Sequence, residues 1–270
     1  MSCRQKKVQR LHFLVMDVIT LCSFKGGTAK TSTCLHIAYE LAARHDKRVL
    51  LIDFDSQANL SVSLGFGPDR METMAPVLME EKLIEEVILQ TEIPGLDLIP
   101  ANAYLDGIER TSQLAGDPYA HERLKRAVAT LKYDYVFIDT PPSLGWLTQS
   151  AFFASNRSVI CAIPEAFSVI ALRRLKEFHE GIQKYHPIEL LGVVLSFWNE
   201  RGAVNEAFLE EIEDAFPKML FDAKIRRDMH VSRAVLSGKP VQEFAPKCRA
   251  SEDYTKLGEE FLSRVEVAHV

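Results

Sequence analysis

The chain has 270 residues, of which 47% are hydrophobic and 26% charged, and its formal net charge is −5 at pH 7. That length suits one large α/β domain, and the composition is ordinary for a globular protein. The acidic balance excludes nucleic-acid binding through the overall field and leaves only a local basic patch. No apolar run approaches ~18 residues, so no transmembrane helix is expected.

Apolar runs alternate with amphipathic stretches along the whole chain. Strands are expected at 14–23, 48–54, 96–100, 135–139, 158–164 and 190–198. Helices are expected at 31–44, 79–90, 121–132, 168–185, 205–216 and 251–265. This alternation predicts a mostly parallel, doubly wound α/β sheet with helices on both faces. We expect a basic N-terminal arm at 1–12 and a single domain at 13–270.

The strand expected at 14–23 leads into a glycine-rich turn and then directly into a helix. The turn and the start of the helix read Lys25-Gly26-Gly27-Thr28-Ala29-Lys30-Thr31-Ser32. Free backbone N–H groups and the positive end of the helix dipole make such a turn a site for phosphate. Lys30 can reach the terminal phosphates, and the Thr31 hydroxyl can bind magnesium. The sequence therefore predicts a site for a nucleoside triphosphate.

Ala29 occupies a position at which a strict P-loop has glycine. If the position requires a positive φ, the Cβ of alanine costs about 1 kcal/mol or more. If the backbone there is already near-helical, alanine is harmless. We expect the near-helical conformation, and a protein that binds no nucleotide is the alternative.

Acidic residues follow two of the expected strands. Asp53 and Asp55 are two residues apart at the end of an expected strand, and we expect one of them to face the metal and phosphates and the other to face the fold. Asp139 ends an apolar run in a Walker-B arrangement, which holds magnesium, often through water. For Asp53 a loop-capping role is the alternative.

These motifs together resemble those of the deviant Walker-A ATPases of the ParA/MinD family. Residues 25–32 resemble K-G-G-x-G-K-[ST], residues 53–57 resemble D-x-D-P-Q with serine for proline, and residues 139–145 resemble the D-x-P-P extension. Later segments resemble the family's P-x-E at 163–165, I-P-R-N at 223–228 and P-x-S-x-[GA]-x-x-x-[YF] at 246–254. The agreement covers about residues 14–262, and it is closest to the short ParA-type (Soj-like) DNA partition ATPases.

The resemblance implies an ATPase that hydrolyses ATP to ADP and phosphate with Mg²⁺, in a homodimer that forms on ATP binding. Lys25 would stabilise transition-state charge in the partner's site, Lys30 would hold the β- and γ-phosphates, and Asp55 would position the attacking water. The implied metal-binding residues are Thr31, Asp53 and Asp139. The implied nucleotide-binding residues are Lys25, Gly26, Gly27, Thr28, Ala29, Lys30, Thr31, Ser32, Pro164, Arg227 and Asp228.

The resemblance also implies non-specific binding of double-stranded DNA and a ParB-like centromere-binding protein as partner. The implied DNA-binding residues are Arg201, Arg227, Lys247 and Arg249. His230 stands where the family has a further DNA-binding arginine, and a mostly neutral imidazole weakens that prediction. The expected location is cytoplasmic and nucleoid-associated, without a membrane contact.

Two alternatives to a partition ATPase stay open. A MinD-like spatial regulator of division would carry a basic amphipathic helix at its C-terminus, but residues 261–270 hold only one strong cation. A pseudo-ATPase regulator, which has lost nucleotide turnover, is the other alternative because of Ala29.

Neither the cysteines nor the histidines form a recognisable metal motif. The five cysteines are odd in number and contain no C-x-x-C pair, and the eight histidines contain no H-x-x-x-H grouping. We therefore expect neither a disulfide framework nor a metal site built from cysteine and histidine.

Overall fold

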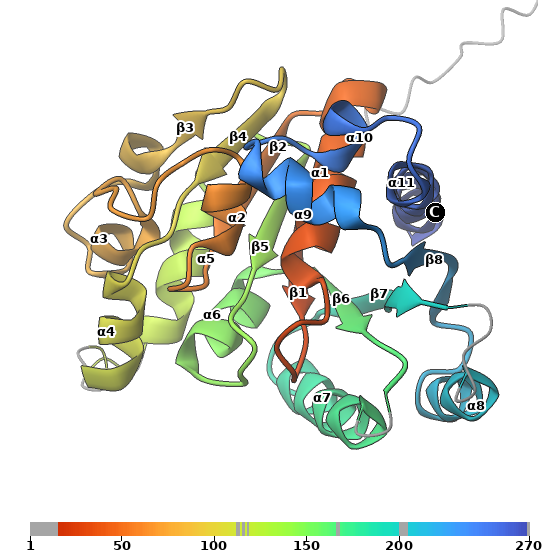
Figure 1. Ribbon diagram of the computed structural model, residues 1–270. Helices are drawn as coiled ribbons and strands as arrows, with labels where there is room; N and C mark the ends of the chain where they lie inside the picture. The colour runs from red at the N-terminus through yellow and green to blue at the C-terminus, as the bar shows by residue number, and fades with distance from the viewer. Residues whose placement is uncertain are drawn as a thin grey trace, which may run out of the picture.

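The computed structural model describes residues 16–111, 114, 117, 119–165, 168–199 and 205–268. Within these residues eight strands form one sheet in the order β3-β4-β2-β5-β1-β6-β7-β8 (Figure 1). The strands are β1 Asp17–Cys22, β2 Val49–Asp53, β3 Leu89–Gln90, β4 Leu96–Ile99, β5 Tyr135–Asp139, β6 Arg157–Ala162, β7 Glu189–Trp198 and β8 Leu220–Arg226. The short β3 pairs antiparallel with β4, and the other pairs are parallel.

Helices connect the strands and cover the sheet. The α-helices are α1 Lys30–His45, α2 Asn59–Ser63, α3 Met74–Leu78, α4 Tyr104–Thr111, α5 Arg123–Val128, α6 Trp146–Ala154, α7 Ser168–Gln183, α8 Asn205–Ala215, α9 Met229–Leu236, α10 Val241–Phe244 and α11 Arg249–Ala268. Two 3₁₀ helices are η1 Ile84–Val87 and η2 Ala120–Glu122. None of the helices in the described part of the chain is both long enough and apolar enough to cross a bilayer.

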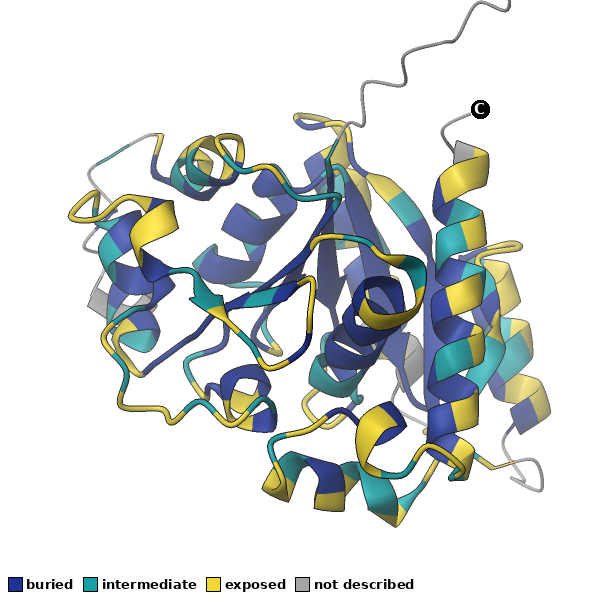
Figure 2. Ribbon diagram, turned by 90° about the horizontal axis from the view of Figure 1, so that it is seen from above, coloured by how far each residue is buried: buried dark blue, intermediate teal, exposed yellow. Residues whose placement is uncertain are grey.

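Different helices cover the two faces of the sheet. The side chains of β5, which point alternately to the two faces, show this. Tyr135 and Phe137 pack into a core with α1 and α11, whereas Val136 and Ile138 pack into a second core with α3 to α6. A third core lies between β6, β7, α7 and α8. Figure 2 shows the buried residues concentrated in the sheet and on the helix sides that face it. The predicted doubly wound α/β class is confirmed.

The register of the central strands decides which residues can meet at one edge of the sheet. β5 lies between β1 and β2, with Asp139 opposite Leu21 on one side and opposite Asp53 on the other. Because these strands are parallel, their carboxyl ends meet at the same edge, where ligands bind in such sheets. The loop that follows β1 and the two acidic strand ends are therefore neighbours.

The six predicted strands are present within a few residues of their expected ends, but β3 and β8 were not predicted. β8 is a half-exposed edge strand, so it lacks the continuous apolar run that marked the others. The helix predicted at 79–90 is wrong. α3 ends at Leu78, Glu80 adopts a left-handed φ of 62°, and η1 and β3 follow instead.

The remaining predicted helices differ mainly in length. The helix predicted at 121–132 is present only in its middle, as α5, after a turn of 3₁₀ helix. Helix α6 and the short α2, α4, α9 and α10 were not predicted, since short helices carry few turns of periodic pattern. The basic arm expected at 1–12 lies outside the described residues.

Candidate nucleotide site

The loop between β1 and α1 is open on its inner side. A Cβ built on Gly26 or Gly27 would meet no atom within 4 Å, and Gly27 has a φ of 76° that L-residues rarely adopt. The Ser23 hydroxyl donates to the Lys25 carbonyl oxygen over 3.1 Å and braces the turn. The space beside these glycines suits phosphate oxygens that approach the backbone N–H groups at the start of α1.

Ala29 does not have the near-helical conformation expected from the sequence. It is the N-cap of α1, with φ 61° and ψ 24° in the left-handed region, and its carbonyl oxygen accepts the Thr33 amide over 2.8 Å. The expectation was wrong because α1 begins only at Lys30, so Ala29 is the N-cap and lies outside the helical backbone conformation. Its Cβ therefore costs about 1 kcal/mol relative to glycine.

Lys30, Thr31 and Asp139 form one buried cluster at the carboxyl edge of the sheet. Lys30 Nζ donates to Asp139 Oδ1 and Thr31 Oγ1 donates to Asp139 Oδ2, each over 2.7 Å. The Lys30 side chain is 7% exposed and that of Asp139 is 0% exposed. Burial alone would lower the pKa of Lys30, but the Asp139 carboxylate raises it above its ordinary value. The cluster therefore holds a fixed cation beside a hydroxyl and a carboxylate.

Asp53 is fully buried behind this cluster and anchors the start of α2. Its Oδ2 accepts the Ser61 amide over 2.8 Å and the Ser61 hydroxyl over 2.7 Å, and its Oδ1 accepts the Asp55 amide over 3.3 Å. Burial, and then the charge of Asp139, raise the pKa of Asp53 to about 7. These contacts favour the loop-capping alternative, and a direct role in magnesium binding stays a prediction.

Ser61 is a residue that the sequence analysis missed. Besides its two bonds to Asp53, its hydroxyl accepts the Ala101 amide over 3.1 Å and so joins α2 to the end of β4. A serine eight residues after an aspartate carries no sequence signal for this role. Only the turn between β2 and α2 brings the two together.

Asp55 lies on the open side, in a cavity of about 390 Å³ that it shares with the glycine-rich loop, Lys30 and Thr31. Its Oδ1 accepts the Gln57 amide over 3.0 Å, and burial raises its pKa above the ordinary value. Thr28 also lines this cavity, and its hydroxyl is buried without a hydrogen-bond partner among the described residues. The residues present thus fit a nucleotide's phosphates and a magnesium ion.

Lys25 stands at the rim of this cavity and makes an ion pair with Glu165, which follows β6. The Lys25 side chain is 44% exposed and that of Glu165 is 53% exposed. Glu165 lines a second cavity of about 660 Å³, so the ion pair lies between the two cavities. This pair is accessible from outside the molecule, in contrast to the buried pair of Lys30 and Asp139.

The second cavity gathers residues from the ends of β6, β7 and β8. Pro164 and Arg227, both predicted to bind nucleotide, line it together with the aromatic Phe197. The Arg227 guanidinium lies 5.4 Å from the centre of the Phe197 ring. Asp228 does not line the cavity, because it caps α9 and accepts the His230 amide over 3.0 Å.

The structure describes three of the four residues that were predicted to bind DNA. Arg227, Lys247 and Arg249 are exposed, and Arg249 Nη2 donates to the Arg227 carbonyl oxygen over 3.5 Å, so the two arginines are neighbours. Arg226, beside them, instead makes an ion pair with Asp253 of α11 over 2.7 Å. Arg201 lies outside the described residues.

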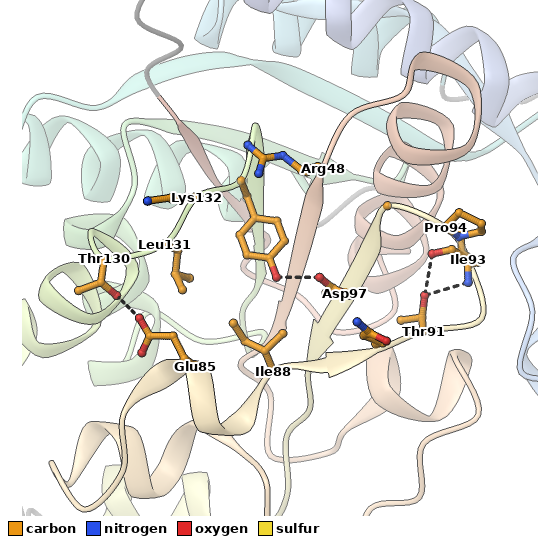
Figure 3. Close-up of a pocket in the computed structure, with 13 residues that line it drawn as sticks. Arg48, Glu85, Ile88, Thr91, Ile93, Pro94, Asp97, Thr130, Leu131 and Lys132 are labelled. Carbon is orange, nitrogen blue, oxygen red and sulfur yellow. Dashed lines mark hydrogen bonds between the residues drawn. The ribbon is translucent and has the colours of Figure 1, made fainter.

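A third cavity, of about 710 Å³, lies at the opposite, amino-terminal edge of the sheet (Figure 3). Arg48 lines it just before β2, Asp97 lies on β4, and Tyr133 donates its hydroxyl to Asp97 over 2.7 Å. This cavity is far from the glycine-rich loop, so its size does not mark the nucleotide site.

The fold and the loop define the class of protein. Four features together make a P-loop ATPase fold. They are a central parallel strand, a glycine-rich turn, a helix that begins with lysine and threonine, and an aspartate at the end of the adjacent strand. The profile of a family described as an AAA domain matches residues 16–191.

Two relatives narrow the class of protein to a family, and one solved structure shares the fold. The chain is 54% identical over 249 residues to a ParA family protein of Chlamydia muridarum (strain MoPn / Nigg), covering 92% of this chain and 98% of the relative. It is 37% identical over 257 residues to the chromosome partitioning protein ParA of Caulobacter vibrioides (strain NA1000 / CB15N), covering 92% and 95%. The cobyrinic acid a,c-diamide synthase of Mycobacterium smegmatis with bound ADP and magnesium aligns at 25% identity and a TM-score of 0.81, covering 94% and 97%. The chain belongs to the ParA family.

Proposed function

We propose that this protein is a partition ATPase that binds ATP with Mg²⁺, dimerises on ATP binding and binds DNA without sequence preference. Hydrolysis to ADP and phosphate would drive DNA segregation together with a ParB-like centromere-binding partner. The observation that carries the proposal is the buried cluster of Lys30, Thr31 and Asp139 beside the open glycine-rich loop. The identity to a chromosome partitioning protein supports the DNA substrate.

The cluster supplies the groups that a magnesium nucleotide requires. Lys30 provides the cation for the terminal phosphates, while the Thr31 hydroxyl and the Asp139 carboxylate are the oxygen ligands that Mg²⁺ prefers. Mg²⁺ held by these groups would neutralise the charge that develops on the phosphates. Asp55, in the same cavity, is placed to orient the attacking water.

Lys25 is the residue proposed to act in the site of a second molecule. Its ion pair with Glu165 is exposed, and exposed pairs contribute only ~0–1 kcal/mol. Lys25 can therefore leave Glu165 and reach a partner's phosphates at little cost. A buried lysine such as Lys30 could not serve this purpose.

ATP turnover, measured with and without non-specific DNA, tests the enzyme proposal. Lys25→Ala should keep ATP binding but lose turnover, since only the transition-state contact is removed. Lys82→Ala, which removes an exposed lysine outside both cavities, is the matched control. Unchanged hydrolysis in Lys25→Ala would refute the role in the partner's site.

DNA binding is tested by charge reversal. Arg227→Glu and Arg201→Glu should weaken binding to every DNA sequence alike and flatten its dependence on salt, because phosphate contacts carry no sequence information. Lys132→Glu, at the opposite edge of the sheet, makes the same charge change as a control. A loss confined to particular sequences would count against phosphate contacts.

Two observations bear on the alternatives. The apolar face of α11, with Tyr254, Phe261 and Val265, is buried against the sheet, so it is not free to lie on a membrane as a MinD-like regulator requires. The left-handed Ala29 favours weaker nucleotide binding, which keeps the pseudo-ATPase as the second candidate. Liposome co-sedimentation tests the first alternative, and titration with a fluorescent ATP analogue tests the second.

A further inference from the structure

Three side chains with metal-binding atoms meet where the start of α9 faces the start of α11. Asp228 and His230 come from the turn after β8 and the first turn of α9, and Cys248 comes from the residue before α11. One potential ligand atom of each lies within 4.8 Å of those of the other two. His230 Nδ1 and Asp228 Oδ1 are 2.7 Å apart.

Backbone amides at the two helix starts hold these side chains in place. Asp228 Oδ1 accepts the His230 amide over 3.0 Å, and its Oδ2 accepts the Ala250 amide over 3.4 Å. Cys248 Sγ accepts the Ser251 amide over 3.4 Å. Such outer contacts orient the ligand atoms. Burial raises the pKa of the Cys248 thiol above its ordinary value, so the metal itself must displace the thiol proton. The cluster is thus supported from both helices.

The three ligand types select the metal. A thiolate, an imidazole and a carboxylate are the ligands of Zn²⁺, whereas Mg²⁺ takes oxygen ligands alone. Zinc bonds of ~2.0–2.3 Å in a tetrahedron place ligand atoms roughly 3.3–3.7 Å apart. The observed separations need to change by about 1 Å, which side-chain rotation of the partly exposed His230 and Cys248 allows.

We propose that Asp228, His230 and Cys248 bind a Zn²⁺ ion, with a fourth position open to water. Each of the three replaces a different residue of the ParA pattern: asparagine at 228, arginine at 230 and serine at 248. The sequence predicted no such site, because the ligands come from two helix starts and form no local motif. The site is separate from the magnesium site, which Thr31 and Asp139 are proposed to form.

Zinc binding changes both charge and connectivity here. The Cys248 thiol proton passes to solvent, His230 binds as the neutral imidazole, and the ion neutralises the carboxylate and the new thiolate. The ion also links the β8–α9 turn to the start of α11, the segments that carry Arg227 and Arg249. It therefore restricts the motion of the two backbone segments that carry these exposed arginines.

Cobalt absorption tests the site directly. The chain, first stripped with a chelator, should bind one equivalent of Co²⁺ with a thiolate-to-metal absorption band that Zn²⁺ then abolishes. Cys248→Ser should remove this band and weaken Zn²⁺ binding by at least about 100-fold, and His230→Gln should weaken it similarly. Circular dichroism verifies that each variant is folded.

Cys3→Ser is the matched control, because it removes a thiol that lies outside the described residues, while Cys22, Cys34 and Cys161 are buried. This variant should keep the band and the affinity. A missing band in the parent chain, a band that survives Cys248→Ser, or a band lost in Cys3→Ser would overturn the proposal. ATP binding and turnover are not the readout, so failure here leaves the proposed function standing.

Discussion

Lys25 lies in the glycine-rich loop and Lys30 begins the helix that follows it. Each is paired with a carboxylate, yet the two pairs differ in nearly every physical respect. Lys30 and Asp139 are 7% and 0% exposed, with Thr31 donating to the same carboxylate. Lys25 and Glu165 are 44% and 53% exposed at the cavity rim. The buried pair is a fixed part of the fold, and the exposed pair is free to exchange partners.

This difference follows from desolvation. A buried ion loses its hydration, so removing its partner leaves an uncompensated charge, whereas an exposed ion regains water when its partner leaves. One lysine thus lies in the proposed phosphate site, and the other lies where a second molecule could reach it. Burial, and not residue type, separates the two proposed roles.

Breaking the buried pair should have the largest effect. Lys30→Ala should lower the free energy of unfolding by about 3–5 kcal/mol, because Asp139 stays buried without its cation. The same change should abolish ATP binding. Urea unfolding measures the first effect, and titration with a fluorescent ATP analogue measures the second.

The double variant Lys30→Met with Asp139→Asn is the control for this prediction. It removes both charges, so much of the lost stability should return while ATP binding stays absent. ATP binding that persists in Lys30→Ala would contradict the role of this lysine.

His36 can be compared with Lys30, because it is also a buried titratable group on α1 but has no carboxylate partner in the described part of the chain. Burial lowers its pKa to about 3, and its Nδ1 has no hydrogen-bond partner among the described residues. The unfolded chain takes up a proton near pH 6.5 and the folded protein does not, so stability is lost as pH falls below that value. Between pH 7.5 and 5, the wild-type protein should lose about 2 kcal/mol relative to His36→Gln, since Asp53 and the other groups titrate alike in both proteins.

Urea unfolding at several pH values measures this slope. Equal slopes in the wild-type protein and in His36→Gln would show that His36 does not titrate as its burial requires.

Ala29→Gly tests whether the left-handed backbone next to Lys30 is strained. Relief of the left-handed alanine should raise the free energy of unfolding by up to about 1 kcal/mol and tighten ATP binding. Ala58, the N-cap of α2, has a similar φ of 54° but is fully buried, so Ala58→Gly also removes a packed methyl group and should gain less stability, without a change in ATP affinity. Weaker ATP binding in Ala29→Gly would contradict the strain argument.

The exposed pair should show the smallest effect on stability. Lys25→Ala and Glu165→Gln should each change the free energy of unfolding by less than about 1 kcal/mol, with little additional change when they are combined. Unfolding at low and at high salt should differ little for either variant. A loss comparable to that of Lys30→Ala would show that the two pairs are not distinct.

Sequence patterns predicted the central strands because each is a continuous apolar run that ends in a recognisable turn or acid. They failed for the segment at 79–90, where the left-handed Glu80 interrupts an otherwise helical pattern. They also failed for β8, whose pairing with β7 is decided by a neighbour distant in the chain. Local pattern carries no information about such pairing.

The sequence by itself determined the α/β class, the phosphate loop after the first strand and the acid at the end of β5, because these depend on residues adjacent in the chain. Only the tertiary structure decided that Asp53 binds Ser61, that Lys25 pairs with Glu165, and that Ala29 is left-handed. It also decided that Cys248 meets His230 and Asp228. Contacts between distant segments, and the burial that sets their energies, exist only after the sheet and its helices have packed.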